Sequence, residues 1–250
     1  MISRLEILLS EDQELSYQMG TVFHGALMEL LPEEVTEGLH SSQVHPYSQY
    51  IVKKEGRWYW VVTALNEKLA KDMIYSSLLP AQGIFLKNND INIKFEEKKL
   101  TETSLEAMSK KFYSQNSGKY VDLDFLTPTS FKQQGKYLFY PDIRGMYISL
   151  LNKYGACDPE VNVRDEDLLE ELVNSTQITR YRLRSCAFYV DNGRVPSFIG
   201  SISLKINGTQ TMRNFADFLF HFGEFSGIGI KSALGMGANR INLEREQKNE

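Results

Sequence analysis

The spacing of hydrophobic residues predicts an alternation of strands and helices in the first hundred residues. The predicted elements are a strand over 2–9, a helix over 16–31, strands over 49–54 and 57–64, a helix over 65–79 and a strand over 91–95. Glu55-Gly56 lies between the middle strands and favours a hairpin turn, and Pro80 ends the second helix. This β-α-β-β-α-β order is the ferredoxin-like arrangement.

The same order starts again after a polar stretch, 101–118, which has no strand pattern. The second set is a strand from Val121 that stops at Pro128, a helix over 141–154, strands over 179–190 and 195–206, a helix over 212–222 and a strand over 239–243. We therefore predict an α+β fold of two tandem ferredoxin-like (RRM-like) domains, 1–105 and 119–250, with a linker at about 106–118.

Composition and charge exclude some functions. The chain of 250 residues has a net charge of -4, but residues 158–171 contribute -6, so the remainder carries +2 and leaves room for a basic surface. No apolar run approaches the ~20 residues of a membrane-spanning helix, and no secretory signal is evident. Two cysteines, Cys157 and Cys186, are too few for a disulfide framework, which predicts a cytoplasmic setting. No C-x-x-C or H-E-x-x-H is present, and we expect neither metal nor cofactor.

The segment 223–237, GEFSGIGIKSALGMG, is unusually rich in glycine. Its pattern is G-x-G-x5-G-x-G, formed by Gly227, Gly229, Gly235 and Gly237. Lys231 and Ser232 lie between the two pairs, but Ile230 precedes the lysine, so the segment is not a P-loop. Two interpretations stay open: successive amides cradle a phosphate beside Lys231, or the glycines form tight turns against a neighbouring strand.

The segment FGEFSGIGIKSALGMGANRI resembles the C-terminal glycine-rich loop of the CRISPR-associated Cas6 endoribonucleases of the RAMP superfamily. DLDFLTPTSFK (122–132) and LHSSQVHPYS (39–48) are similar to two further segments of that family. The resemblance implies metal-independent cleavage of CRISPR repeat RNA in a precursor transcript, which releases guide RNAs. In that reaction a ribose 2′-hydroxyl attacks the adjacent phosphate and leaves a 2′,3′-cyclic phosphate and a 5′-hydroxyl.

The resemblance also implies roles for three of the four histidines. His40, expected in a loop after Gly38, corresponds to the catalytic position and is the predicted general base. His45 stands where the family has a basic residue, and it either assists His40 or caps a turn. His24, on the first helix, either completes the site or is a partly buried core residue. We interpret His221 as structural.

Three arginines recur at every second position of a predicted strand: Arg180, Arg182 and Arg184. With Arg194 in the following turn they are predicted to contact RNA together with the glycine-rich segment, and a solvated strand face is the alternative. The predicted partners are CRISPR repeat RNA, a type I or type III effector complex and a second copy of the chain. Two other functions stay open: a non-catalytic RNA-binding subunit of an effector complex, or a protein that binds a small anion at the glycine-rich segment.

Overall fold

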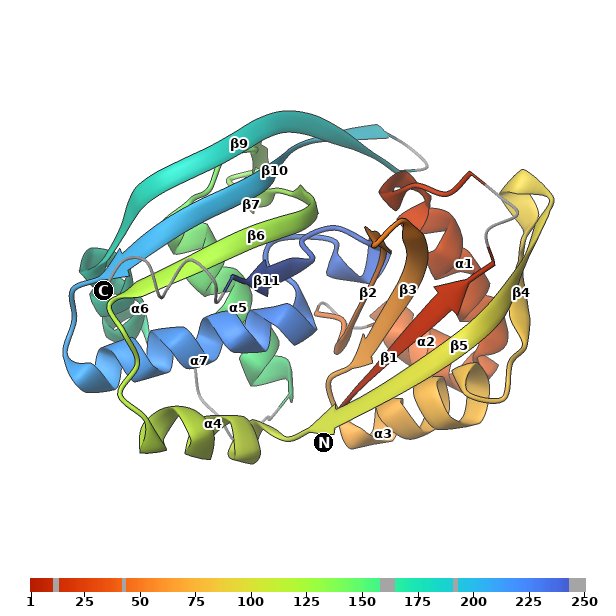
Figure 1. The fold of residues 1–250 in the computed structure, drawn as a ribbon, viewed down its shortest axis with the longest axis horizontal. Helices are drawn as coiled ribbons and strands as arrows, with labels where there is room; N and C mark the ends of the chain where they lie inside the picture. Colours follow the sequence, from red (N-terminus) through yellow and green to blue (C-terminus); the bar gives the residue numbers. More distant parts are fainter. Residues whose placement is uncertain (11–13, 42–43, 158–164, 191–192, 243–250) are drawn as a thin grey trace. The chain divides into compact units, whose positions relative to one another are not determined.

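The computed structural model describes residues 1–10, 14–41, 44–157, 165–190 and 193–242, apart from the side chains of His40, Ser41 and Asn88 (Figure 1). The chain forms two compact units. Unit 1 comprises Met1–Ser104 together with Lys231–Gly235, and unit 2 comprises Leu105–Ile230 and the chain from Met236 onward. Both units combine helices with an antiparallel sheet, which confirms the predicted α+β class. None of the described helices is long and apolar enough to cross a membrane.

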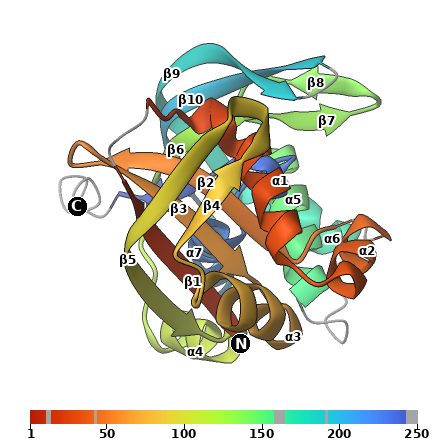
Figure 2. The same cartoon turned by 90° about the vertical axis from the view of Figure 1, so that its right-hand side faces the viewer.

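Unit 1 is built on an antiparallel sheet with the strand order β2-β3-β1-β5-β4 (Figure 2). Its strands are β1 (Ile2–Leu9), β2 (Tyr47–Lys54), β3 (Arg57–Ala64), β4 (Gly83–Leu86) and β5 (Ile91–Thr103). Its helices are α1 (Gly20–Leu30), which follows a 3-10 turn at Tyr17–Met19, α2 (Glu33–Ser41), and α3 (Glu67–Leu69), which continues as a π-helix over Ala70–Leu78. The predicted hairpin turn is confirmed, since Glu55 and Gly56 have φ angles of 51° and 84°. The sequence pattern predicts neither α2 nor β4.

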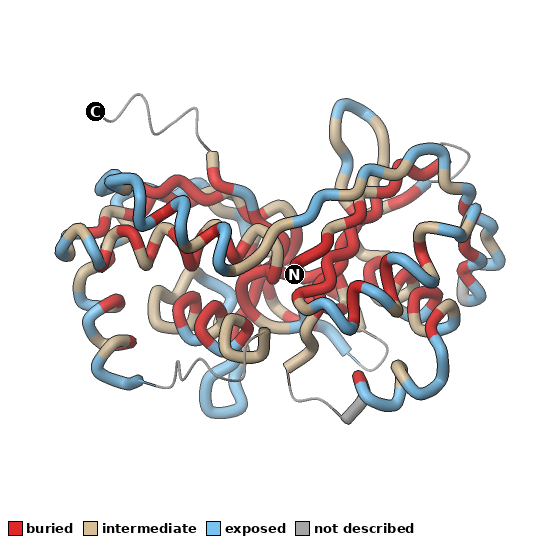
Figure 3. Tube along the Cα trace, turned by 90° about the horizontal axis from the view of Figure 1, so that it is seen from below, coloured by how far each residue is buried: buried red, intermediate tan, exposed pale blue. Residues whose placement is uncertain are grey.

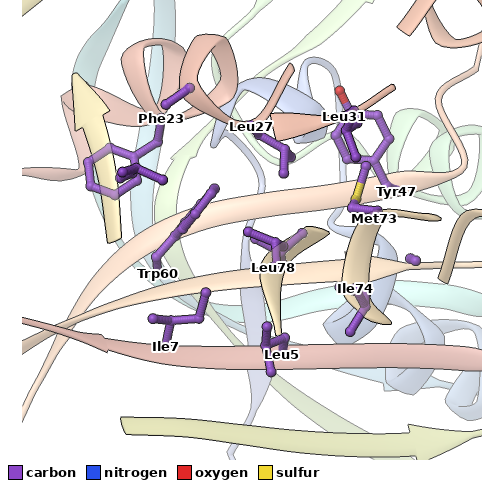
Figure 4. Close-up of a cluster of buried hydrophobic side chains, with 14 of the residues drawn as sticks. Leu5, Ile7, Phe23, Leu27, Leu31, Tyr47, Trp60, Met73, Ile74 and Leu78 are labelled. Atoms are coloured by element: carbon purple, nitrogen blue, oxygen red, sulfur yellow. The ribbon is translucent and has the colours of Figure 1, made fainter. Parts of the chain in front are cut away.

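The core of unit 1 is one hydrophobic cluster made by alternate strand residues and one stripe of each helix (Figure 4). Trp60 of β3 and Phe23 of α1 meet edge to face, with ring centroids 5.3 Å apart. Burying one such side chain contributes about 1.5–3 kcal/mol. Leu39 and Tyr47 belong to the same cluster, so the chain is anchored on both sides of the segment that holds His45.

Unit 2 has an antiparallel sheet in the order β11-β6-β10-β9. Its elements are α4 (Leu105–Ser114), β6 (Tyr120–Thr129), the hairpin β7 (Phe131–Gln133) and β8 (Lys136–Leu138), α5 (Ile143–Cys157), α6 (Glu166–Ser175), β9 (Thr176–Val190), β10 (Gly193–Ile206), α7 (Gln210–Ser226) and β11 (Asn239–Ile241). On β10, Ile202, Ser203 and Leu204 are buried, whereas Ser201 and Lys205 are half-buried. Exposed residues lie beside buried ones on the helices (Figure 3). β6 runs through Pro128 rather than stopping there.

The stretch 106–118, expected to be a linker, contains helix α4 instead. This helix packs on α7, where the Phe112 and Phe218 ring centroids are 6.3 Å apart. Just beyond the helix, the Ser117 hydroxyl donates a hydrogen bond to Asp217 Oδ2 at 2.8 Å. The stretch is therefore a packed part of unit 2, in which Met108 and Phe112 are buried.

Candidate active site and RNA interface

Helix α1 and the segment that leads into strand β2 bring two of the predicted histidines to one tyrosine. His24 lies on α1, and Tyr47 opens β2 with 1% of its surface exposed. The Tyr47 hydroxyl and His24 Nδ1 are 3.1 Å apart, and their rings are nearly parallel, at 10°. The ring of His45 has its centroid 5.8 Å from that of Tyr47. Both histidines therefore flank Tyr47, which is absent from the predicted site.

The environment of Tyr47 fixes the proton of this hydrogen bond. Burial raises the pKa of Tyr47 far above its ordinary value, so the hydroxyl keeps its proton at neutral pH. Within the described residues, His24 Nδ1 is the hydrogen-bond partner of this hydroxyl. Because a buried hydroxyl proton without an acceptor is unfavourable, Tyr47 donates to Nδ1. Neutral His24 therefore carries its own proton on Nε2, which becomes a hydrogen-bond donor.

His40 lies in the last turn of helix α2, not in the predicted loop. Gly38 is exposed and does not break the helix. The first turn of α2 carries Glu33 and Glu34, which favour the helix N-terminus, and Leu39 is buried in the core of unit 1. These interactions outweigh the cost of about 1 kcal/mol for glycine in a helix. The side chain of His40 lies outside the described residues, so its predicted role as base stays a prediction.

Three of the four glycines in the pattern lie in unit 2, and their backbone amides donate hydrogen bonds within that unit. The Gly227 amide donates to Gly223 O at 2.8 Å, that of Gly229 to Ser149 Oγ at 2.8 Å, and that of Gly237 to Pro128 O at 3.0 Å. A Cβ at Gly237 would lie 2.1 Å from Ile228 O, at a φ of 73°. These three amides are therefore already paired within the protein, and contact of the glycine-rich segment with RNA stays a prediction. Tight packing explains these glycines.

A buried lysine holds this part of the glycine-rich segment. Lys153 of α5 is 7% exposed, and its Nζ donates to Gly227 O at 2.9 Å and to Gly229 O at 3.1 Å. Burial lowers the pKa of Lys153 from 10.5 to about 7. No sequence motif marks this residue, and its local signal is a lysine on the buried stripe of α5, beside Leu150 and Tyr147.

The tip of the glycine-rich segment, Lys231–Gly235, belongs to unit 1. Ser232–Leu234 forms a 3-10 turn, η4, that contacts β2 and α1. Lys231 is exposed, whereas Ser232 is buried. Gly235 has a φ of 104°, and the Gly20 Cα lies 3.0 Å from where its Cβ would be, so both the angle and the space require glycine. The predicted lysine is thus available at the surface of the unit that holds His24 and His45.

Strand β9 presents its arginines along one edge of the sheet in unit 2. Arg180, Arg182 and Arg184 pair with Ser203, Ser201 and Ile199 of β10, and all three are exposed. A hollow of about 260 Å³ is lined by Arg180, Tyr181, Arg182, Ser201, Ile202 and Ser203. Within the described part of the chain, the side chains of Arg180 and Arg182 form no hydrogen bond or ion pair.

Arg194 does not join this row of arginines. It pairs with Tyr189, five positions along β9 from Arg184. Successive side chains of a strand point to opposite faces, so Arg194 lies on the other face of the β9–β10 ribbon. The row of arginines therefore consists of Arg180, Arg182 and Arg184, as the period-two spacing predicts, and contact of Arg194 with RNA stays a prediction.

Several solved structures described as Cas6 or RAMP proteins share this fold. A Cas6 product complex from Thermus thermophilus matches with a TM-score of 0.81 at 22% identity, covering 97% of this chain and 100% of that one. Another Cas6 product complex matches with a TM-score of 0.80 at 20% identity, covering 96% of this chain and 99% of that one. A structure described as a RAMP protein binding different RNA substrates gives 0.61 at 15% identity, with 96% and 99% covered. The fold is therefore of the Cas6 class.

Sequence relatives then give the family. The family model for CRISPR-associated endoribonuclease Cas6 matches residues 123–239. The enzyme of that name from Streptococcus thermophilus is 33% identical over 232 residues, 91% of this chain and 93% of the relative. That from Mycobacterium tuberculosis (strain CDC 1551 / Oshkosh) is 34% identical over 247 residues, 96% and 78% of the two chains. The chain belongs to the CRISPR-associated endoribonuclease Cas6 family, as the glycine-rich segment predicts.

Proposed function

We propose that this Cas6 chain is a metal-independent endoribonuclease that cuts the repeat sequence of a precursor CRISPR transcript and so releases guide RNAs. Two relatives of 33% and 34% identity bear the name of Cas6 endoribonucleases. The observation that carries the proposal is the cluster of His24, His45 and Tyr47 in the same unit as exposed Lys231. Imidazoles suit proton transfer at neutral pH because their ordinary pKa is about 6.5.

In the proposed reaction, the ribose 2′-hydroxyl attacks the adjacent phosphorus and loses its proton to a base. The bond from phosphorus to the 5′-oxygen breaks, and that oxygen takes a proton from an acid, which leaves a 2′,3′-cyclic phosphate and a 5′-hydroxyl. We assign His40 as the base. His45 in its imidazolium form is the acid, and His24, with its proton on Nε2, donates a hydrogen bond to the charged phosphorane. Lys231 adds a positive charge.

The proposed RNA contacts are the tip of the glycine-rich segment, Lys231–Gly235, and the three arginines of β9, Arg180, Arg182 and Arg184. Arg180 and Arg182, free of ion pairs within the described part of the chain, suit contacts to backbone phosphates. Two solved Cas6 relatives are described as product complexes, which supports repeat RNA as the ligand. Association with a type I or type III effector complex, and pairing with a second copy, are expectations from the family resemblance.

We also propose that each unit is a ferredoxin-like (RRM-like) domain. In unit 1 the order β2-β3-β1-β5, with helices after β1 and after β3, supports this assignment. In unit 2 the order β9-β10-β6-β11, with helices after β6 and after β10, supports it equally. Strand β4 then counts as an addition at the edge of the first sheet.

The proposal is tested by incubating the purified chain with repeat RNA in excess EDTA and analysing the ends of the products. We expect a single cut that leaves a 2′,3′-cyclic phosphate and a 5′-hydroxyl. Cutting that requires an added divalent ion would contradict the metal-independent chemistry. RNA binding without a cut would favour the non-catalytic RNA-binding subunit, and neither binding nor cutting would favour a protein that takes a small anion.

A further inference from the structure

A buried amide holds the tip of the glycine-rich segment, and the proposed reaction does not use it. Gln49 lies in β2 with 0% of its surface exposed. Its Nε2 donates to Gly20 O at 2.8 Å and to Ala233 O at 3.0 Å, and its Oε1 accepts from Trp60 Nε1 at 2.9 Å. Because an indole N–H only donates and a carbonyl only accepts, this amide orientation is the one that satisfies all three partners.

The backbones of α1 and of the tip are in direct contact beside this amide. A Cβ at Gly20 would lie 2.4 Å from Leu234 O and 3.0 Å from Gly235 Cα. No side chain therefore separates the first turn of α1 from the tip, and Gln49 bridges the two backbones where they meet. All of these residues belong to unit 1.

The elements that Gln49 joins are those that carry the histidine cluster. His24 lies on α1, one turn after Gly20, and Tyr47 lies two positions before Gln49 on the same face of β2. The hydrogen bond between Tyr47 and His24 ties these two elements together, and Gln49 adds the tip, which begins with Lys231. A shift of the tip would move the lysine relative to the histidines.

We propose that Gln49 is a positioning residue for RNA cleavage, which holds Lys231 at a fixed place relative to His24 and Tyr47. This inference rests on the proposed function. An apolar residue in its place removes the hydrogen bonds to the Ala233 carbonyl and from the Trp60 indole N–H, and leaves Gly20 O with only its bond inside α1. Water or a moved tip then satisfies the buried groups that have lost their partners. A displacement of about 1 Å at a reacting group is enough to slow an enzyme on the order of 100-fold.

The test uses the full chain with Gln49→Met, and with Ile51→Ala as the matched control on the same buried face of β2. Two quantities are measured: hydrogen exchange of the amides in 231–235 without RNA, and the single-turnover cleavage rate at saturating repeat RNA, per folded molecule. We expect Gln49→Met to raise exchange in the tip by on the order of 10-fold and to slow cleavage by on the order of 10- to 100-fold. RNA affinity should change little, and Ile51→Ala should match the wild type in tip exchange and in cleavage.

A second variant, Gln49→Glu, keeps the size of the side chain and changes only its hydrogen-bonding groups. It therefore tests the positioning role apart from any effect of core packing. Its carboxylate repels the carbonyls of Gly20 and Ala233, whereas the protonated acid donates to one of them and still accepts from Trp60. The cleavage rate of Gln49→Glu, divided by that of the wild type at the same pH, should therefore rise as the pH falls. The same ratio for Ile51→Ala should not change with pH.

Two results would overturn the proposal. Tip exchange in Gln49→Met equal to that of the wild type would mean that the amide does not hold the tip. Faster exchange with cleavage unchanged would mean that holding the tip is irrelevant to the reaction. A wild-type chain that cuts no repeat RNA would instead overturn the proposed function, and the positioning role with it, while the exchange data would still decide whether the anchor exists.

Discussion

Lys153 makes the stability of unit 2 depend on pH in a predictable direction. Burial lowers its pKa from 10.5 to about 7, so between these values the unfolded chain binds a proton that the folded chain does not. The free energy of unfolding therefore rises as the pH rises through this range. Below pH 7, the contribution of Lys153 to it does not change with pH. One pH unit corresponds to about 1.4 kcal/mol, so the whole range corresponds to about 5 kcal/mol at most.

Replacing Lys153 by Met removes the amine and keeps an unbranched side chain. Between pH 7 and pH 9, we expect the free energy of unfolding of the wild type to rise by about 2 kcal/mol relative to Lys153→Met. The control is Lys136→Met, which removes an exposed lysine of the same unit and should leave the pH dependence unchanged.

The assay is urea unfolding at several pH values in this range. Circular dichroism follows the helices of both units, whereas tryptophan fluorescence follows unit 1 alone, because both tryptophans, Trp58 and Trp60, lie there. The predicted pH dependence should appear in circular dichroism, which reports on the unit that holds Lys153. Equal pH slopes for the wild type and Lys153→Met would refute the reasoning, because the buried amine would then keep its ordinary pKa.

Three substitutions test the proposed roles at the site. His40→Ala should slow cleavage by a factor on the order of 10²–10⁴ at unchanged RNA affinity, and an equal loss of affinity in a binding assay would make His40 a contact residue. Lys231→Ala should weaken RNA binding and lower the slope of log affinity against log salt by about one; an unaltered slope in a salt titration would remove Lys231 from the interface. Tyr47→Phe should lower stability by about 1 kcal/mol and slow single-turnover cleavage with RNA affinity intact, since His24 loses the hydrogen bond that fixes its proton. Cleavage at the wild-type rate would show that this proton position is unimportant.

Local sequence signals predict most of the fold because they act on neighbouring residues. The alternation of Ile202 and Leu204 with polar residues marks a half-buried strand, and Glu55-Gly56 marks its own turn. The predictions are wrong where packing against distant elements determines the local secondary structure. Gly38 is predicted to break the chain before His40, yet burial of the adjacent Leu39 keeps it helical. Helix α4 is missed because its few apolar residues gain their partners only when α7 packs on them.

The site is harder to predict because its contacts join distant parts of the chain. The family resemblance identifies His24 and His45, but Tyr47 becomes significant only through a partner 23 positions away. The bonds of Lys153 to Gly227 and of Gln49 to Ala233 span 74 and 184 positions. Glycine spacing predicts a tight backbone without revealing whether its amides face a ligand or the protein, and here most of them are used by the protein.

The most direct test of the proposed chemistry replaces one atom of the substrate. A repeat RNA with a single deoxyribose on the 5′ side of the cut keeps every other contact and lacks the attacking oxygen. We predict that the chain binds this RNA as tightly as the unmodified repeat RNA and does not cut it at that position, with or without EDTA. Cleavage of the modified RNA at the rate of the unmodified one would contradict attack by the 2′-hydroxyl.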